Sequence, residues 1–151
     1  MNKPQLLSSL ATALNGELLG GDTEFSSVST DSRSLEKGSL YVALKGERFD
    51  GNDFVAEAED AGAAAAIVSK QVTTSLPILM VKDTGLALAD LALINRMQCP
   101  ATVVALTGSQ GKTTVKEMAG AILSEAGTTL ITEKNLNNTI GVPLTLLRLK
   151  D

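Results

Sequence analysis

Residues 102–114 read TVVALTGSQGKTT, an apolar run that predicts a buried strand, followed by a glycine-rich turn and the start of a helix. Gly108 and Gly111 allow the backbone to turn with its N–H groups pointing inward, and the positive end of the helix dipole faces the same space. We expect Lys112 to reach the β- and γ-phosphates of a nucleotide, and the Thr113 hydroxyl to bind the Mg²⁺ that bridges them. The stretch therefore predicts an ATP or GTP site.

This glycine pattern is shorter than the usual phosphate-binding motif, because Leu106 stands where that motif has its first glycine. A Gly-x-x-Gly-Lys-Ser/Thr sequence arises by chance in about one chain of this length in a few hundred, and the alternative is a plain glycine turn with an exposed lysine. Lys112 and Thr113 are the expected catalytic residues, and Thr113 is the expected metal ligand. The expected nucleotide contacts are Gly108, Ser109, Gln110, Gly111, Lys112, Thr113 and Thr114.

The residues after the loop predict the remainder of a strand–helix–strand unit. Its helix is expected over 112–125, with Gly127 as its stop, and the returning strand over 128–132. Pro143 suits the first turn of one more helix, which we expect to be cut short by the end of the chain. Two strands and one helix leave most of a parallel sheet absent, so we expect this unit to be the truncated beginning of a nucleotide-binding domain.

Upstream of the loop, short strands and helices alternate. Asp53 is expected to cap a helix that runs to about Ala61, and another helix is expected over 84–97. A first helix after Pro4 is predicted by leucines that share one helical face, namely Leu6, Leu7, Leu10 and Leu14. Apolar runs predict strands at 25–30, 39–44, 64–69 and 78–81. This alternation predicts an α/β fold with a largely parallel sheet.

Pro100 marks the expected domain boundary, because it stops the preceding helix and a new strand begins at Thr102. We therefore predict a small α/β domain over 1–99 and the first unit of a phosphate-loop domain over 100–151.

Composition excludes several kinds of site. The 151 residues include no histidine, which removes the Ser-His-Asp triad and any His-ligated metal from consideration. Aromatic residues make up only 3% and the net charge is -4, so a nucleic-acid surface is not expected. Cys99 has no partner for a disulfide, and no run of apolar residues is long enough to span a membrane. We expect a globular, cytoplasmic protein that neither binds nucleic acid nor inserts into a membrane.

Three segments closely resemble the Mur ligases, and the resemblance covers essentially the whole chain. They are the loop TGSQGKT at 107–113, NLNNTIGVPLTLL at 135–147, and the upstream pair STDSR at 29–33 and LYVALKGERFDG at 40–51. The sequence departs from the family pattern at Asn52, where many members have histidine.

The resemblance implies an ATP- and Mg²⁺-dependent ligase of cytoplasmic peptidoglycan synthesis. Within the family, segment 135–147 resembles the members that join D-alanyl-D-alanine to UDP-N-acetylmuramoyl-tripeptide. The tripeptide carboxylate would be phosphorylated by ATP, and the amine of D-alanyl-D-alanine would then attack the acyl phosphate. Activation is needed because a carboxylate is a poor electrophile, and the phosphoryl transfer itself requires mostly positioning and charge neutralisation.

The family's first domain holds the UDP end of the substrate, which implies roles for polar residues of this chain. The implied substrate contacts are Ser29, Thr30, Asp31, Ser32, Arg33, Lys45 and Gly46, with Asn135, Asn137 and Asn138 at the junction of the nucleotide and peptide substrates. Without the resemblance, these segments would be interpreted as a hydrophilic turn, a solvated hairpin and a polar turn.

Two other functions are considered: a free-standing module that binds UDP-muramyl peptide and carries a vestigial phosphate loop, and a phosphate-loop kinase or ATPase. Residues 135–147 weigh against the kinase, and the intact Lys112–Thr113 pair favours a parent enzyme that uses ATP. The family's remaining metal ligands, its adenine pocket and its C-terminal domain all lie beyond Asp151. We therefore expect this chain, a monomer, to have no ligase activity by itself.

Overall fold

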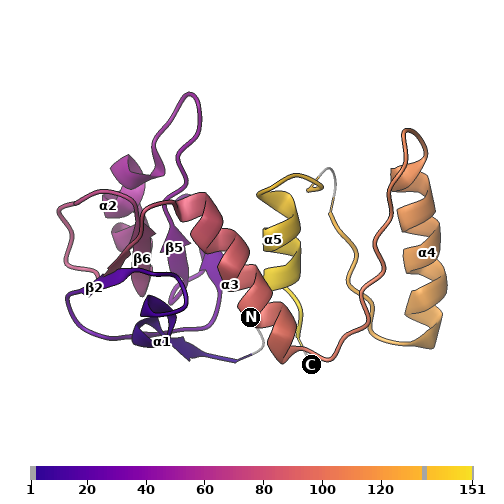
Figure 1. Cartoon of the computed structure of the whole chain (residues 1–151), viewed down its shortest axis with the longest axis horizontal. Helices are drawn as coiled ribbons and strands as arrows, with labels where there is room; N and C mark the ends of the chain where they lie inside the picture. Colours follow the sequence, from indigo (N-terminus) through magenta and orange to yellow (C-terminus); the bar gives the residue numbers. More distant parts are fainter. Residues whose placement is uncertain (1–2, 134–135, 151) are drawn as a thin grey trace.

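A five-stranded sheet forms the centre of the N-terminal part of the molecule (Figure 1), in a computed structural model that describes residues 3–133 and 136–150. Strands β4 to β7 run parallel, and β2 pairs antiparallel with β7 at one edge. In spatial order the strands are β2 (Glu17–Leu19), β7 (Ile78–Met80), β6 (Ala65–Val68), β5 (Leu40–Val42) and β4 (Val28–Ser29). The predicted α/β class with a largely parallel sheet is confirmed.

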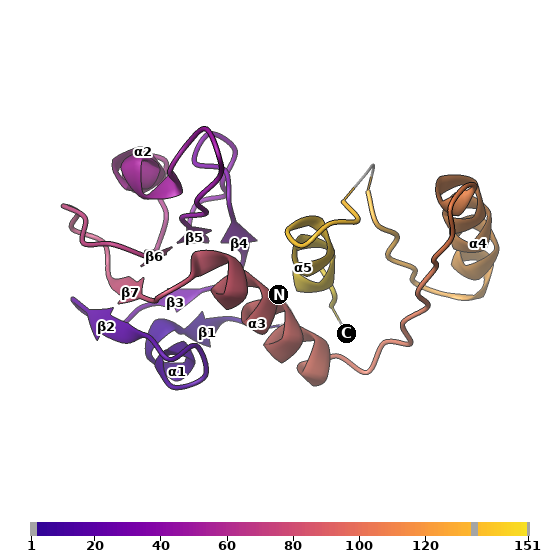
Figure 2. The same cartoon turned by 45° about the horizontal axis from the view of Figure 1, so that its top comes forward.

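The sheet buries both of its faces. In β5, Leu40 and Val42 pack into one apolar core, whereas Tyr41 packs into the other. Helices α1 (Leu7–Ala11) and α3 (Thr84–Gln98) contribute to the first core, and α2 (Val55–Asp60) lies across the sheet in the second (Figure 2). A short ribbon of β1 (Gln5–Leu6) and β3 (Glu24–Phe25) lies beside α1. The arrangement leaves the carboxyl ends of β4 to β7 together at one edge, where α/β sheets bind ligands.

Two details of the predicted helices in the N-terminal part are wrong, and the single strand predicted at 25–30 is divided between β3 and β4, which lie in different sheets. Leu6 belongs to β1 and is 45% exposed, whereas the other three leucines of the predicted helical face are buried. Asp53 is not the helix cap: Asp50 accepts a hydrogen bond from the Asn52 amide (3.0 Å) and caps the 3-10 helix η1 (Gly51–Phe54), which leads into α2. Strand β2 was not predicted, since three residues at a sheet edge carry too little apolar pattern.

The phosphate-loop part lies beyond the sheet, with α4 (Lys112–Ala126) farthest from it (Figures 1 and 2). Helix α4 confirms the predicted helix and its stop at Gly127. The strands predicted at 102–106 and 128–132 are wrong for this structure, because neither segment pairs with another strand in the described residues. A strand forms only where a neighbour supplies its hydrogen bonds; here Val104 is 64% exposed.

Helix α5 (Gly141–Leu147) packs against α3 and not against α4. Leu147 is buried in the first core, and the Asn95 amide of α3 donates to the carbonyls of Leu146 (2.9 Å) and Leu149 (3.3 Å) where α5 ends. Pro143 lies in the first turn as predicted, but the helix ends at Leu147 and not at the end of the chain. Within the described residues, no helix is both long and apolar enough to cross a membrane.

Candidate functional site

The predicted phosphate loop lies between the extended segment 101–107 and the first turn of α4. Gly108 (φ 154°) and Gly111 (φ 75°) both adopt backbone conformations that favour glycine. Helix α4 begins immediately after Gly111, so the amides of its first turn have no helical partners and face the loop. The Lys112 ammonium group donates to the Gly108 carbonyl and closes the loop on itself. The loop thus has the shape and the cation of an anion-binding turn.

The remaining predicted nucleotide contacts lie on the same exposed surface. Ser109 and Gln110 form the tip of the loop, and Thr113 and Thr114 lie in the first turn of α4. The other lysine near this end of α4, Lys116, is engaged by the Thr132 carbonyl and by Glu117 (2.9 Å). Lys112, by contrast, has no carboxylate partner among the described residues, and the carbonyl that it binds belongs to the loop itself, so Lys112 is the lysine already placed at the loop.

A second group of predicted residues follows β4 at the carboxyl edge of the sheet. The Arg33 guanidinium donates to both oxygens of Asp31, at 2.9 and 2.7 Å. These hydrogen bonds lower the pKa of Asp31 to about 2 and raise the pKa of Arg33. Ser32 is buried and its hydroxyl donates to Glu57 of α2 (3.1 Å). Asp31, Ser32 and Arg33 are thus held by partners within the protein. Thr30 makes no side-chain hydrogen bond to any residue that the structure describes.

Lys45 and Gly46 lie in a projecting hairpin, residues 45–50, which follows β5 (Figure 1). Lys45 and Asp50 pair across its base, and the Gly46 amide donates to the Phe49 carbonyl (2.9 Å). Residues 45–49 are exposed. The hairpin and the loop after β4 emerge from neighbouring parallel strands, so the structure brings these two predicted groups to one edge of the sheet.

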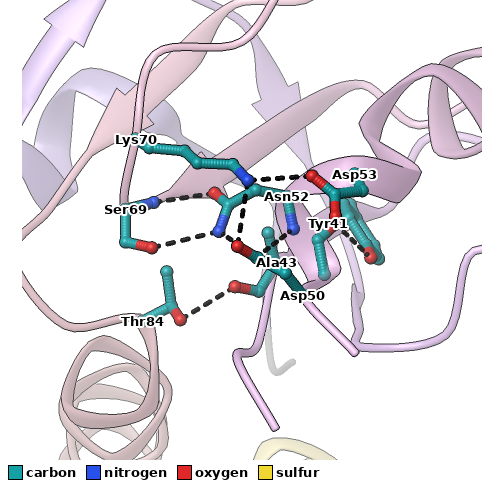
Figure 3. A network of polar contacts seen from close by, with 9 residues as sticks. Tyr41, Ala43, Asp50, Asn52, Asp53, Ser69, Lys70 and Thr84 are labelled. Carbon is teal, nitrogen blue, oxygen red and sulfur yellow. Dashed lines mark hydrogen bonds and ion pairs between the residues drawn. The ribbon is translucent and has the colours of Figure 1, made fainter. Parts of the chain in front are cut away.

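A polar clasp of Asp50, Asn52, Asp53, Ser69 and Lys70 joins the root of this hairpin to the end of β6 (Figure 3). Asn52 is only 4% exposed. Its side-chain oxygen accepts from the Ser69 backbone amide (2.9 Å), and its side-chain NH₂ group donates to the Ser69 hydroxyl (3.1 Å) and to Asp50 (2.6 Å). The Lys70 ammonium group binds Asp50 (2.9 Å) and Asp53 (2.8 Å). Asn52, the departure from the family pattern, therefore serves the protein's own backbone.

Sequence reasoning missed the Ser69–Lys70 half of the clasp. The available signal was position, because both residues directly follow a buried strand of a parallel sheet, where functional side chains gather. Hydrogen bonds from Asn52 and then from Lys70 lower the pKa of Asp50 to about 2, and the two carboxylates raise the pKa of Lys70.

We expect the free energy of unfolding to fall as the pH drops from about 4 to about 2. Asp31 and Asp50 have a folded-state pKa of about 2, below their ordinary value of 3.8, so the stability that they contribute is present above that value and is lost on protonation. The Asp50→Asn variant removes one of these groups and should lose less stability across this window. The measurement is the urea midpoint against pH.

The matched control for this pH experiment is Asp60→Asn, which removes an exposed carboxylate without an ion pair in the described part of the chain. It should follow the wild-type curve. Equal slopes for Asp50→Asn and the wild type would show that the clasp carboxylate contributes nothing.

The predicted asparagine turn leads into α5. The Asn138 side-chain oxygen accepts from the amides of Ile140 (3.2 Å) and Gly141 (2.7 Å), so Asn138 holds the turn immediately before the helix, whose N-cap is Ile140. Asn137 is exposed beside it, and Asn135 lies outside the described residues. A shallow apolar groove separates this turn from the start of α3, with Leu86 and Ala89 on one side and Ile140 and Val142 on the other. The turn therefore lies beside the start of α3.

Comparison with protein families finds two matches in chain order. The model described as "Mur ligase family, catalytic domain" matches residues 24–94, and the "Mur ligase middle domain" matches residues 106–151.

Curated relatives are similar along nearly the whole chain. The UDP-N-acetylmuramoyl-tripeptide–D-alanyl-D-alanine ligase of Escherichia coli (strain K12) is 59% identical over 143 residues, which are 95% of this chain and 32% of that protein. The ligase of the same name from Haemophilus influenzae is 43% identical, over 94% of this chain and 32% of that protein. The chain spans about a third of the length of these relatives.

Solved structures show the same fold. A crystal structure of MurF from Acinetobacter baumannii matches with a TM-score of 0.90 and 45% identity, over 98% of this chain and 34% of that chain. The MurF ligase of Thermotoga maritima in complex with ADP matches with a TM-score of 0.73 and 37% identity, over 80% of this chain and 28% of that chain. From the two family matches, the similarity to these relatives and the shared fold, the chain belongs to the Mur ligase family.

Proposed function

We propose that this chain is the N-terminal third of an ATP-dependent ligase that joins D-alanyl-D-alanine to UDP-N-acetylmuramoyl-tripeptide. The observation that carries the proposal is the 59% identity to the Escherichia coli ligase of that name over 95% of the chain. The closed glycine loop with Lys112 at the start of α4 supports it, because a glycine loop at a helix N-terminus can bind the phosphates of a nucleoside triphosphate. The relative solved with ADP supports nucleotide use as well.

The reaction divides into two steps. A γ-phosphoryl group passes from ATP to the terminal carboxylate of the tripeptide, and ADP leaves. The amine of D-alanyl-D-alanine then attacks the carbonyl carbon, loses a proton, and expels phosphate together with one oxygen of the former carboxylate. Lys112 and the amides of the loop would hold the β- and γ-phosphates and offset the charge that develops on them.

Mg²⁺ would neutralise the phosphates in this reaction, with the Thr113 hydroxyl as a ligand. The donor set fits a nucleotide-bound magnesium, because a hydroxyl at the start of the helix lies next to the loop that holds the phosphates. Among residues 3–133 and 136–150, no group of three or more His, Cys, Asp or Glu side chains is placed to hold a metal. Phosphate oxygens of the nucleotide would supply the other ligands.

The substrate contacts follow from the same proposal. Residues 1–99 form the domain for the UDP end of the muramyl substrate, and residues 100–151 begin the ATP-binding domain, a division supported by the gap between the two family matches. Lys45 and the other predicted contacts at the sheet edge, Ser29 to Arg33 and Gly46, would hold the nucleotide end. Asn137 and Asn138 would lie at the junction with the peptide. The enzyme would act as a monomer in the cytoplasm, where ATP is available.

The test in cells uses a strain in which the endogenous tripeptide ligase is placed under a repressible promoter. The complete reading frame that contains this chain should restore growth and the pool of UDP-N-acetylmuramoyl-pentapeptide on repression, and residues 1–151 alone should not. Restored growth with the 151-residue chain alone would contradict the expected need for further domains. Failure of the complete protein to restore the pentapeptide pool would contradict the proposed function.

A further inference from the structure

The projecting hairpin 45–50 has little apolar packing to fix its position. Its residues 45–49 are exposed, Phe49 is 58% exposed, and the Phe49 ring lies so close to Gly46 that a Cβ there would be 2.8 Å from Cε1 of the ring. Two backbone hydrogen bonds shape it, from Gly46 to the Phe49 carbonyl and from Gly51 to the Leu44 carbonyl (2.8 Å). These bonds define the turn. They do not fix the direction in which it projects from the sheet, which depends on the contacts of Asp50 at its base.

The polar clasp makes these contacts with the base of the hairpin. One oxygen of Asp50 accepts from Asn52, and the other accepts from the Lys70 ammonium group, so the last residue of the hairpin is held from two sides (Figure 3). Asn52 binds Ser69, and Lys70 is the next residue, so both connect the hairpin to the end of β6, an entirely buried strand. The hairpin is thereby oriented on the neighbouring strand, which is rigid.

The lysine of the clasp and the cations of the hairpin differ in whether a carboxylate neutralises them. Lys70 is neutralised by Asp50 and Asp53, so its charge is used within the protein. Lys45 and Arg48 form no ion pair with any described residue and project into solvent. Two unpaired cations can bind a diphosphate, whereas a lysine between two carboxylates can fix the positions of the segments that carry them.

We propose that Lys70 is a positioning residue, which fixes hairpin 45–50 so that Lys45 and Arg48 meet the diphosphate end of the nucleotide substrate. The inference rests on the proposed function for the identity of that substrate. Lys70 touches neither substrate nor ATP in this scheme, and its effect passes through Asp50 and the hairpin.

The experiment compares Lys70→Met, Lys70→Arg and the control Lys37→Met in the complete ligase. Methionine keeps the aliphatic length of the side chain and removes the two ion pairs, arginine keeps a cation for both carboxylates, and Lys37 is an exposed lysine before β5, at the opposite edge of the sheet. Lys70→Met should raise the KM for UDP-N-acetylmuramoyl-tripeptide about fivefold, with the KM for ATP and kcat unchanged. Lys70→Arg should restore the wild-type KM.

Amide hydrogen exchange in the complete protein gives a readout that needs no substrate. The amides of Gly46 and Gly51 should exchange about fivefold faster in Lys70→Met than in Lys37→Met, while the amides of β5 and β6 keep their protection. Unchanged exchange at the hairpin overturns the positioning role, as does a KM for ATP that rises equally or a Lys70→Arg variant as impaired as Lys70→Met. A wild-type complete protein without ligase activity overturns the proposed function and, with it, the substrate named here, whereas exchange still decides whether Lys70 holds the hairpin.

Discussion

Lys112→Ala in the complete enzyme should lower kcat by about 10²- to 10³-fold, the loss typical of removing one group that stabilises charge in a transition state. Lys112 is the cation at the start of α4, and its ammonium group closes the loop on the Gly108 carbonyl. A phosphate that enters the loop would take over this hydrogen bond, because a charged acceptor binds an ammonium group more strongly than a carbonyl does. The measurement is the rate of amide formation at saturating concentrations of ATP, UDP-N-acetylmuramoyl-tripeptide and D-alanyl-D-alanine.

The matched control for this variant is Lys37→Ala, which removes the same charge from an exposed position before β5, far along the chain from the loop. It should retain wild-type kcat. A Lys112→Ala enzyme within threefold of wild type would mean that the loop does not serve the reaction, as expected of a vestigial phosphate loop.

Gly141→Ala should lower the free energy of unfolding by about 2 kcal/mol and detach α5 from α3. A Cβ at position 141 would lie 2.4 Å from the Leu136 Cα and 2.5 Å from the Leu136 carbonyl carbon. Those are backbone atoms, so a side-chain rotation cannot relieve the clash. The turn that Asn138 holds must open, and Leu147 then loses its place in the core. Urea denaturation and amide exchange of 141–147 measure the two effects.

Gly21→Ala is the matched control, because a Cβ there meets no atom within 4 Å. Its free energy of unfolding should stay within about 0.5 kcal/mol of wild type. Equal stability of the two variants would show that the approach of Leu136 to Gly141 does not exist in solution.

Local signals account for most of what the sequence predicted correctly. The strands at 64–69 and 78–81 and the helix over 84–97 are predicted from apolar patterns within a few residues. Each appears in the structure with its ends shifted by at most one residue. The glycines of the phosphate loop are likewise a local signal, since the backbone turns at the positions that they occupy.

What the sequence did not predict depends on partners far along the chain. Segment 102–106 has the composition of a strand, but strand formation requires a neighbour, and the described residues supply none. Lys70 lies 20 residues from Asp50, and Asn95 lies 51 residues from the Leu146 carbonyl. A helix pattern shows that position 95 faces the core, but only the packing of α5 explains why a buried asparagine is tolerated there.

The central claim is that ATP activates the tripeptide carboxylate for amide formation by the protein to which this chain belongs. It is tested most directly with UDP-N-acetylmuramoyl-tripeptide in which both oxygens of the terminal carboxylate are a heavy isotope. This substrate is incubated with the complete protein, ATP, Mg²⁺ and D-alanyl-D-alanine. Mass spectrometry of the products should find the pentapeptide and one labelled oxygen in the released phosphate for each amide bond formed. Pentapeptide with unlabelled phosphate, or phosphate release without pentapeptide, would contradict the account.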